Sequence, residues 1–226
     1  MTPTRSELAA LTLDPPSFLK SKDAVLRRMA VTTLDRSTAV AHFQLLAQLA
    51  QDEVDAVRTA AAERLGLCGS ASVPILEILR SDSVAAVRES VATAYGELRD
   101  PKAIAWLAEA GEFDDDRQVR EAAVAALGAI DDDGAVEPLL LAIAEGPPQV
   151  RRRAIAAITV YDDPRVEMAI RKALPINEQA LVALDSVFEE ARYSRHEMGE
   201  AHKSQAQDAL GRVLGQIDEL VEVPLR

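Results

Sequence analysis

Residues 114–128 read DDDRQVREAAVAALG, and this segment is the unit from which much of the chain is built. It begins with a loop acid, Asp114, and carries a Val-Arg pair at residues 119 and 120. An alanine-rich stretch then leads to Gly128. Because its apolar residues recur at spacings of three and four, the segment predicts a loop followed by a helix with one apolar face.

Copies of this unit recur at a nearly constant period. Five arginines follow an apolar residue and lie 31, 30, 32 and 31 residues apart: Arg27, Arg58, Arg88, Arg120 and Arg151. Six residues before them stand Ser21, Asp52, Asp82, Asp114 and Glu145, of which the last four are acidic. A period of this length is typical of repeat proteins in which each repeat is one supersecondary unit.

A second set of apolar positions supports the same register. About 15 residues before the arginines, an apolar residue is followed three positions later by leucine, at Leu46, Leu76, Leu107 and Leu139. Each period therefore predicts two helices of about 10 to 15 residues. Asp100-Pro101 and Asp163-Pro164 are expected to begin helices, whereas Gly66, Gly96 and Gly128 are expected to end the second helix of their repeats.

These features resemble HEAT repeats, specifically the short bacterial type also found in phycobilisome lyases. The resemblance implies an all-α fold, a right-handed α-solenoid of about five to six helix pairs with capping helices at both ends. We expect a single domain over residues 1–226, divided into an N-terminal cap (1–21), the repeats (22–192) and a C-terminal capping helix (193–226). The cap includes a short helix over 6–12, and a degenerate sixth pair is expected at 164–172 and 178–192.

Composition narrows the function classes. The formal charge of -12 opposes approach to a phosphate backbone, so nucleic acid is a disfavoured partner and a basic protein or peptide a favoured one. The single cysteine excludes an internal disulfide, and we find no signal peptide and no apolar run long enough to span a membrane. The sequence therefore predicts a soluble, cytoplasmic protein that does not enter a membrane.

The recurrent charges are predicted to form a structural ladder rather than a phosphate site. In HEAT-like repeats the loop acid and the arginine pair between neighbouring repeats, and here each arginine comes with an acid of its own at a fixed spacing. Arg27 is the expected exception, because Ser21 replaces its acid. The ladder set is Asp52, Arg58, Asp82, Arg88, Asp114, Arg120, Glu145 and Arg151.

No residue pattern predicts catalysis, a metal or a cofactor. His196 and Glu200 share a helical face, but His202 lies on another side, whereas HEAT-like deoxyhypusine hydroxylases use several His-Glu pairs. Cys68 has no basic neighbour in sequence to activate its thiol. Trp106 is expected to pack between repeats, away from the concave cleft that HEAT-like alkylpurine DNA glycosylases use. We therefore expect a protein that is not an enzyme.

Partner binding is predicted on the concave side, which the second helices of a HEAT solenoid line. Residues one and five positions after the anchor arginines should meet there: Arg28, Thr59, Glu63, Glu89, Thr93, Glu121 and Arg152. The leading function is a scaffold or adaptor that holds a partner segment along this mildly acidic surface, although a solvated face without any ligand would look the same. Alternatives are a bilin- or cofactor-handling, lyase-like protein and a HEAT-like DNA-binding or DNA-repair protein.

Overall fold

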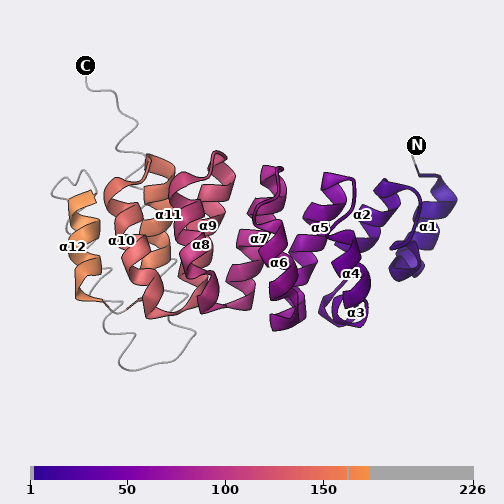
Figure 1. Ribbon diagram of the computed structural model, residues 1–226, viewed down its shortest axis with the longest axis horizontal. Helices are drawn as coiled ribbons and strands as arrows, with labels where there is room; N and C mark the ends of the chain where they lie inside the picture. The colour runs from indigo at the N-terminus through magenta and orange to yellow at the C-terminus, as the bar shows by residue number, and fades with distance from the viewer. Residues whose placement is uncertain (1–2, 162, 174–226) are drawn as a thin grey trace, which may run out of the picture. The chain divides into compact units, whose positions relative to one another are not determined.

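The computed structural model describes residues 3–161 and 163–173, and every regular element within these ranges is helical (Figure 1). Contacts divide the chain into two compact units, unit 1 (residues 1–130) and unit 2 (residues 131–226), which are described separately. The expected single domain over residues 1–226 stays a prediction.

Unit 1 begins with α1 (Arg5–Leu13), which contains the helix expected at 6–12, and the 3-10 turn η1 (Pro15–Phe18). Four second helices follow at nearly constant intervals: α2 (Ala24–Thr32), α5 (Asp55–Leu65), α7 (Ala85–Leu98) and α9 (Arg117–Ile130). The first helices between them are α3 (Arg36–Ala41) with α4 (Phe43–Leu49), then α6 (Val73–Leu79) and α8 (Ile104–Phe113). The 3-10 turns η2 (Gly66–Ser72) and η3 (Pro101–Ala103) precede α6 and α8.

The second helices of unit 1 lie side by side in chain order, α2 against α5, α5 against α7 and α7 against α9 (Figure 1). Contacts between successive second helices outnumber those between successive first helices. The second helices therefore form one continuous layer of unit 1, and its being the concave side stays a prediction.

The residue before each anchor arginine fills the core between the two helix layers. Leu26, Val57, Val87 and Val119 are buried, and so are Leu46, Leu76 and Leu107 of the first helices. Burying one such side chain contributes on the order of 1.5–3 kcal/mol. Both periodic apolar positions of the sequence thus supply buried core side chains in unit 1.

The expectation that glycine ends each second helix is wrong for two of the three glycines. Gly66 follows the last residue of α5, but Gly96 and Gly128 lie inside α7 and α9. The left-handed conformation after these helices is taken by Arg99 and Asp131 instead. At Gly96 a side chain is excluded by packing, since a Cβ there would lie 3.1 Å from the Cα of Ala126 on α9.

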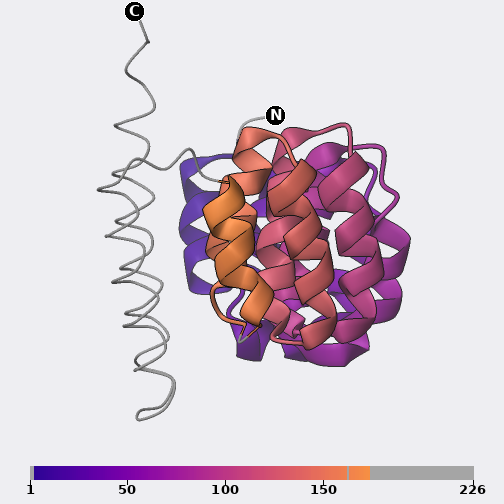
Figure 2. The same cartoon turned by 90° about the vertical axis from the view of Figure 1, so that its left-hand side faces the viewer.

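Unit 2 contains η4 (Asp133–Ala135), α10 (Val136–Glu145), α11 (Pro148–Ile158) and α12 (Pro164–Ala173) within its described residues. The three α-helices run beside one another (Figure 2), with α10 contacting both α11 and α12. Helix α12 lies where the first helix of the degenerate sixth pair is expected, and the carboxylate of Asp163 accepts the backbone N–H of Arg165 at its start. The second helix of that pair (178–192) and the C-terminal cap (193–226) lie outside the described residues.

No helix within the described ranges is both long enough and apolar enough to cross a lipid bilayer.

Candidate functional site

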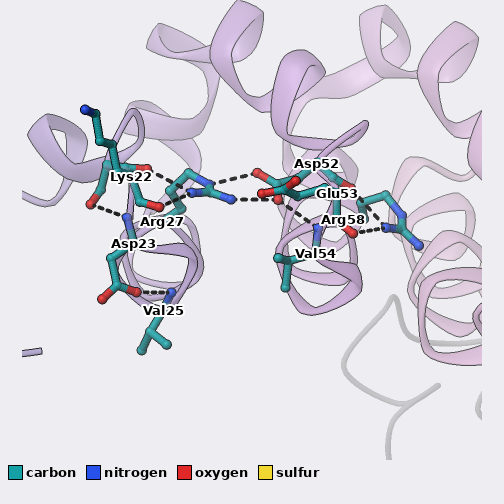
Figure 3. A network of polar contacts seen from close by, with 9 residues as sticks. Lys22, Asp23, Val25, Arg27, Asp52, Glu53, Val54 and Arg58 are labelled. Carbon is teal, nitrogen blue, oxygen red and sulfur yellow. Dashed lines mark hydrogen bonds and ion pairs between the residues drawn. The ribbon is translucent and has the colours of Figure 1, made fainter. Parts of the chain in front are cut away.

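Three arginines of unit 1 join successive repeats. Arg58 donates from Nε and Nη2 to the carboxylate of Asp82 at 2.8 and 3.0 Å, and from Nη1 to the backbone carbonyl of Asp52 at 2.9 Å. Arg27 and Arg88 donate in the same way to Asp52 and Asp114, as Figure 3 shows for Arg27. We call these pairs, Arg27–Asp52, Arg58–Asp82 and Arg88–Asp114, the ladder.

The ladder pairs each arginine with the acid of the following repeat, not with the acid six residues before it. The hydrogen bond from the arginine to the earlier residue goes to its backbone carbonyl, which Ser21 supplies to Arg27 as an acid would. Arg27 is therefore not the exception that the sequence suggests, because Asp52 supplies its carboxylate. Two parallel N–H to oxygen bonds between a guanidinium and a carboxylate also fix the relative orientation of the two repeats.

Each ladder carboxylate also holds the loop that carries it. Asp52, Asp82 and Asp114 accept the backbone N–H two residues later, at 3.0, 2.9 and 2.9 Å. Burial raises the pKa of Asp52 and Asp114, but the hydrogen bonds from their arginines and from the backbone outweigh it and lower the pKa below the ordinary value. The pKa of Asp82 is lowered mainly by its hydrogen bond from Arg58.

These lowered pKa values predict that acid destabilises unit 1. A carboxyl whose pKa is lower in the folded than in the unfolded chain adds stability above its unfolded pKa, and loses it as the pH falls through the folded pKa. We therefore expect the melting temperature to fall steeply below about pH 4, the unfolded pKa of aspartate. Thermal melts from pH 7 to pH 2 measure this, and Asp82→Asn, which cannot titrate at that position, should show a shallower fall. An equally steep fall in the variant would contradict the ladder as its source.

Two further arginines of the repeat have different surroundings. Arg120 donates from Nη1 to the backbone carbonyls of Asp114 and Asp115. Arg151, in unit 2, donates from Nη2 to the carbonyl of Gly146 at 3.2 Å, while its buried Nε has no hydrogen-bond partner among the described residues. A carboxylate pairing of Glu145 with either arginine stays a prediction.

The layer of second helices in unit 1 contains a pocket of about 310 Å³ between α5 and α7, which we call the groove. Two adjacent second helices form its walls, so the groove follows directly from the close packing of that layer. Its lining residues are Thr59, Glu63, Arg64 and Leu67 on one side and Ala86, Glu89, Ser90, Thr93 and Glu97 on the other. The volume is at the low end of the range for ligand pockets.

The groove is acidic. Three carboxylates, those of Glu63, Glu89 and Glu97, face one guanidinium, that of Arg64. Burial raises the pKa of Glu89, and the negative charges of Asp116 and Glu63 raise it further. The part of the chain that the structure describes places no hydrogen bond or ion pair on the carboxylate of Glu89. The groove thus holds negative charge that its own walls do not neutralise.

Four of the seven residues predicted for partner binding line the groove: Thr59, Glu63, Glu89 and Thr93. Glu121 lies outside it, on α9, where Nε of Arg117 donates to its carboxylate at 2.6 Å. Arg28 is an exposed residue of α2, and Arg152 belongs to α11 of unit 2. Four of the predicted residues therefore lie together between α5 and α7, and partner binding by any of the seven stays a prediction.

The sequence prediction missed Arg64, Ser90 and Glu97, although all three line the groove. The prediction used a single row of residues along each helix. A groove between two helices is lined by the whole side of each helix that faces the other. Thr59 and Glu63 lie four residues apart on such a side of α5, and Leu67 of η2 follows four residues later. Extending the predicted rows by one position toward the neighbouring helix would have included Arg64 and Ser90.

The other candidate residues that the structure describes give no sign of chemistry. Burial raises the pKa of the Cys68 thiol, which makes its reactive thiolate rarer. Trp106 is partly buried, and its ring centroid lies 5.8 Å from that of Tyr95 on α7, so it packs between repeats. No group of three or more His, Cys, Asp or Glu side chains is placed to hold a metal ion in the described ranges. His196, Glu200 and His202 lie outside those ranges.

Comparison with known proteins agrees with this architecture. Residues 72–159, less than half of the chain, match the family of HEAT repeats. The protein contains HEAT repeats. Among solved structures, a chain of the complex of CpcE and CpcF of phycocyanin lyase from Nostoc sp. PCC7120 is similar, with a TM-score of 0.57 and 22% sequence identity over 97% of this chain and 96% of that chain.

A likeness at this identity shows the fold alone. Comparison with curated proteins gives no significant match. The predicted all-α solenoid of HEAT-like repeats is confirmed, and its resemblance to the repeats of phycobilisome lyases is supported by both the family match and the structural likeness. What the repeats bind must be argued from their own surface.

Proposed function

We propose that the protein is a non-enzymatic scaffold or adaptor that holds a segment of a basic protein partner in the groove between α5 and α7. The observation that carries this proposal is the uncompensated negative charge of the groove, centred on Glu89. A positive side chain of a partner would neutralise that charge and lower the pKa of Glu89 toward its ordinary value. Complementary charge of this kind also speeds association and disfavours wrong partners.

The repeat architecture supports a protein as the partner. Stacked helix pairs create extended inner surfaces, and repeat proteins use these surfaces to bind chain segments. The similar solved structure is itself a complex of two proteins, CpcE and CpcF. The ladder arginines could not serve as phosphate ligands, because their guanidinium groups are already paired with carboxylates of the next repeat.

A double charge reversal tests the proposal. Glu63→Lys combined with Glu89→Lys should weaken partner binding by at least about tenfold, since it turns attraction into repulsion within the groove. The matched control is Glu109→Lys combined with Glu112→Lys, which changes the formal charge equally at two exposed positions of α8. The measurement is quantitative recovery of partner from a lysate of the source organism by immobilised wild type and by each variant.

Cross-linking then locates the contact. In a Cys68→Ser background, Thr93→Cys carries a photoreactive group inside the groove, and Glu109→Cys carries the same group on α8. We expect a covalent adduct with the recovered partner from position 93 only. Equal recovery by both double variants, or equal adducts from both positions, would refute binding in the groove.

A bilin-handling, lyase-like role is the second candidate, and the likeness to a chain of a phycocyanin lyase complex supports it. The charge of the groove opposes it, because a bilin carries carboxylates that three glutamates would repel. Titrating the protein with a bilin and following visible absorbance separates the two candidates. A saturable absorbance change that Glu89→Lys alters would favour the lyase-like role.

A further inference from the structure

Three hydroxyl groups line the groove, and each has already donated its hydrogen. Thr59 donates to the carbonyl of Asp55 at 3.0 Å, Ser90 to that of Ala86 at 3.0 Å and Thr93 to that of Glu89 at 3.1 Å. Each bond runs to the carbonyl four residues earlier on the same helix. With these bonds made, the hydroxyl oxygens are available to a ligand as hydrogen-bond acceptors.

The carboxylates of the groove are acceptors as well. Glu63, Glu89 and Glu97 in their ionised form offer no donor, so six of the seven polar side chains in the lining can only accept. The seventh, Arg64, is the single donor, and its Nε is buried within the wall. A ligand that satisfies this groove must therefore bring several donors of its own along with positive charge.

We propose that the groove receives an arginine side chain of the partner rather than a lysine. This inference rests on the proposed function and names the group that the groove recognises. A guanidinium presents five N–H donors in a planar fork, whereas an ammonium presents three from one point. The acceptors are divided between the two walls, with Thr59 and Glu63 on α5 and the others on α7, so that a ligand in the groove has acceptors on both sides.

The cost of removing water from the entering cation also favours an arginine side chain over a lysine. The groove also contains the apolar side chains of Leu67 and Ala86, so an entering cation loses part of its water shell. A guanidinium is more weakly hydrated than an ammonium and therefore loses less. The one cation in the wall, Arg64, leaves an excess of two carboxylates in the lining, enough to accommodate a further positive charge.

Titration of the full chain with small blocked amino acids tests the preference for arginine. The backbone amide signals of the isotope-labelled protein are followed by NMR during titration with N-acetyl-arginine amide, N-acetyl-lysine amide and the neutral N-acetyl-citrulline amide. We expect the arginine probe to shift the signals of Thr59, Glu63, Glu89 and Thr93, and to bind about fivefold more tightly than the lysine probe, the net effect of about one additional hydrogen bond. The citrulline probe should bind the most weakly.

Two variants sharpen the test. Glu89→Gln keeps the shape of the groove but removes its central charge, and should weaken the arginine probe several-fold, whereas Glu109→Gln on α8 should leave it unchanged. Thr93→Val removes an acceptor at constant shape and should reduce the preference for arginine over lysine. The amide spectrum itself reports whether each variant is folded.

The possible failures are distinguishable. Equal binding of the arginine and lysine probes would overturn the guanidinium preference, while a partner cross-linked at position 93 would still support the proposed function. Shifts confined to residues outside the groove, or no shift with any probe, would also overturn the inference. Loss of the position-93 adduct with intact partner recovery would instead overturn the proposed function.

Discussion

Replacing Asp82 by alanine should lower the free energy of unfolding by about 2–3 kcal/mol, because it leaves the guanidinium of Arg58 without its carboxylate. The pair is well shielded, with 16% of the Arg58 side chain and 10% of the Asp82 side chain exposed. Breaking a fully buried pair costs about 3–5 kcal/mol, and the remaining exposure to water reduces that figure. The substitution also removes the acceptor for the backbone N–H of Val84.

Denaturant unfolding measures this loss, with matched variants that identify its source. Asp82→Asn keeps one acceptor oxygen and should lose less stability than Asp82→Ala. Asp115→Ala removes an exposed acid from an equivalent loop and should change the free energy of unfolding by no more than about 0.5 kcal/mol. If Asp82→Ala and Asp115→Ala cost the same, the ladder contributes nothing that a surface charge does not.

Gly96→Val should also cost about 2–3 kcal/mol, through packing rather than charge. A Cβ at this position would meet the Cα of Ala126 at 3.1 Å and its Cβ at 3.2 Å. Neither atom is the flexible end of a long side chain, so α7 and α9 must move apart along their shared interface. Loss of contact between two packed helices is expensive because protein interiors contain little free volume.

The size of the added side chain separates steric strain from helix propensity. Gly96→Ala gains helix propensity and loses packing, so it should cost less than Gly96→Val. At the exposed position 105 of α8, Ala105→Val should cost less than about 0.7 kcal/mol, the propensity difference alone. Chemical denaturation of the three variants decides the matter, and a Gly96→Val effect no larger than that of Ala105→Val would contradict close packing at Gly96.

The helix pairs could be predicted from the sequence because every repeat must bury an apolar side chain on each of its two helices. A buried apolar residue before the arginine and a leucine on the first helix must recur wherever one pair stacks on the next, so Val57 and Leu76 belong to visible series. The structural role of each glycine could be predicted less well from the sequence. An end position and a close helix approach both favour glycine, and Gly66 combines the two whereas Gly96 shows only the second.

The partner of each arginine shows a similar ambiguity. The sequence places an acid six residues before Arg58 and another 24 residues after it, and only the stacking of repeats selects the second as the carboxylate partner. For a related reason, the sequence predicted only some of the residues that line the groove. Periodicity indicates which face of α5 is polar, but the flank that contributes Arg64 depends on where α7 lies.

The ladder has a consequence for how unit 1 unfolds. Each of its pairs joins one repeat only to the next, so the coupling between repeats is of nearest-neighbour type, as in a one-dimensional chain of interacting elements. The three links add to the apolar contacts that join α2, α5, α7 and α9. Weakening the middle link, Arg58–Asp82, would then lower the coupling between the repeats on either side of it, so that unfolding becomes less cooperative as well as easier.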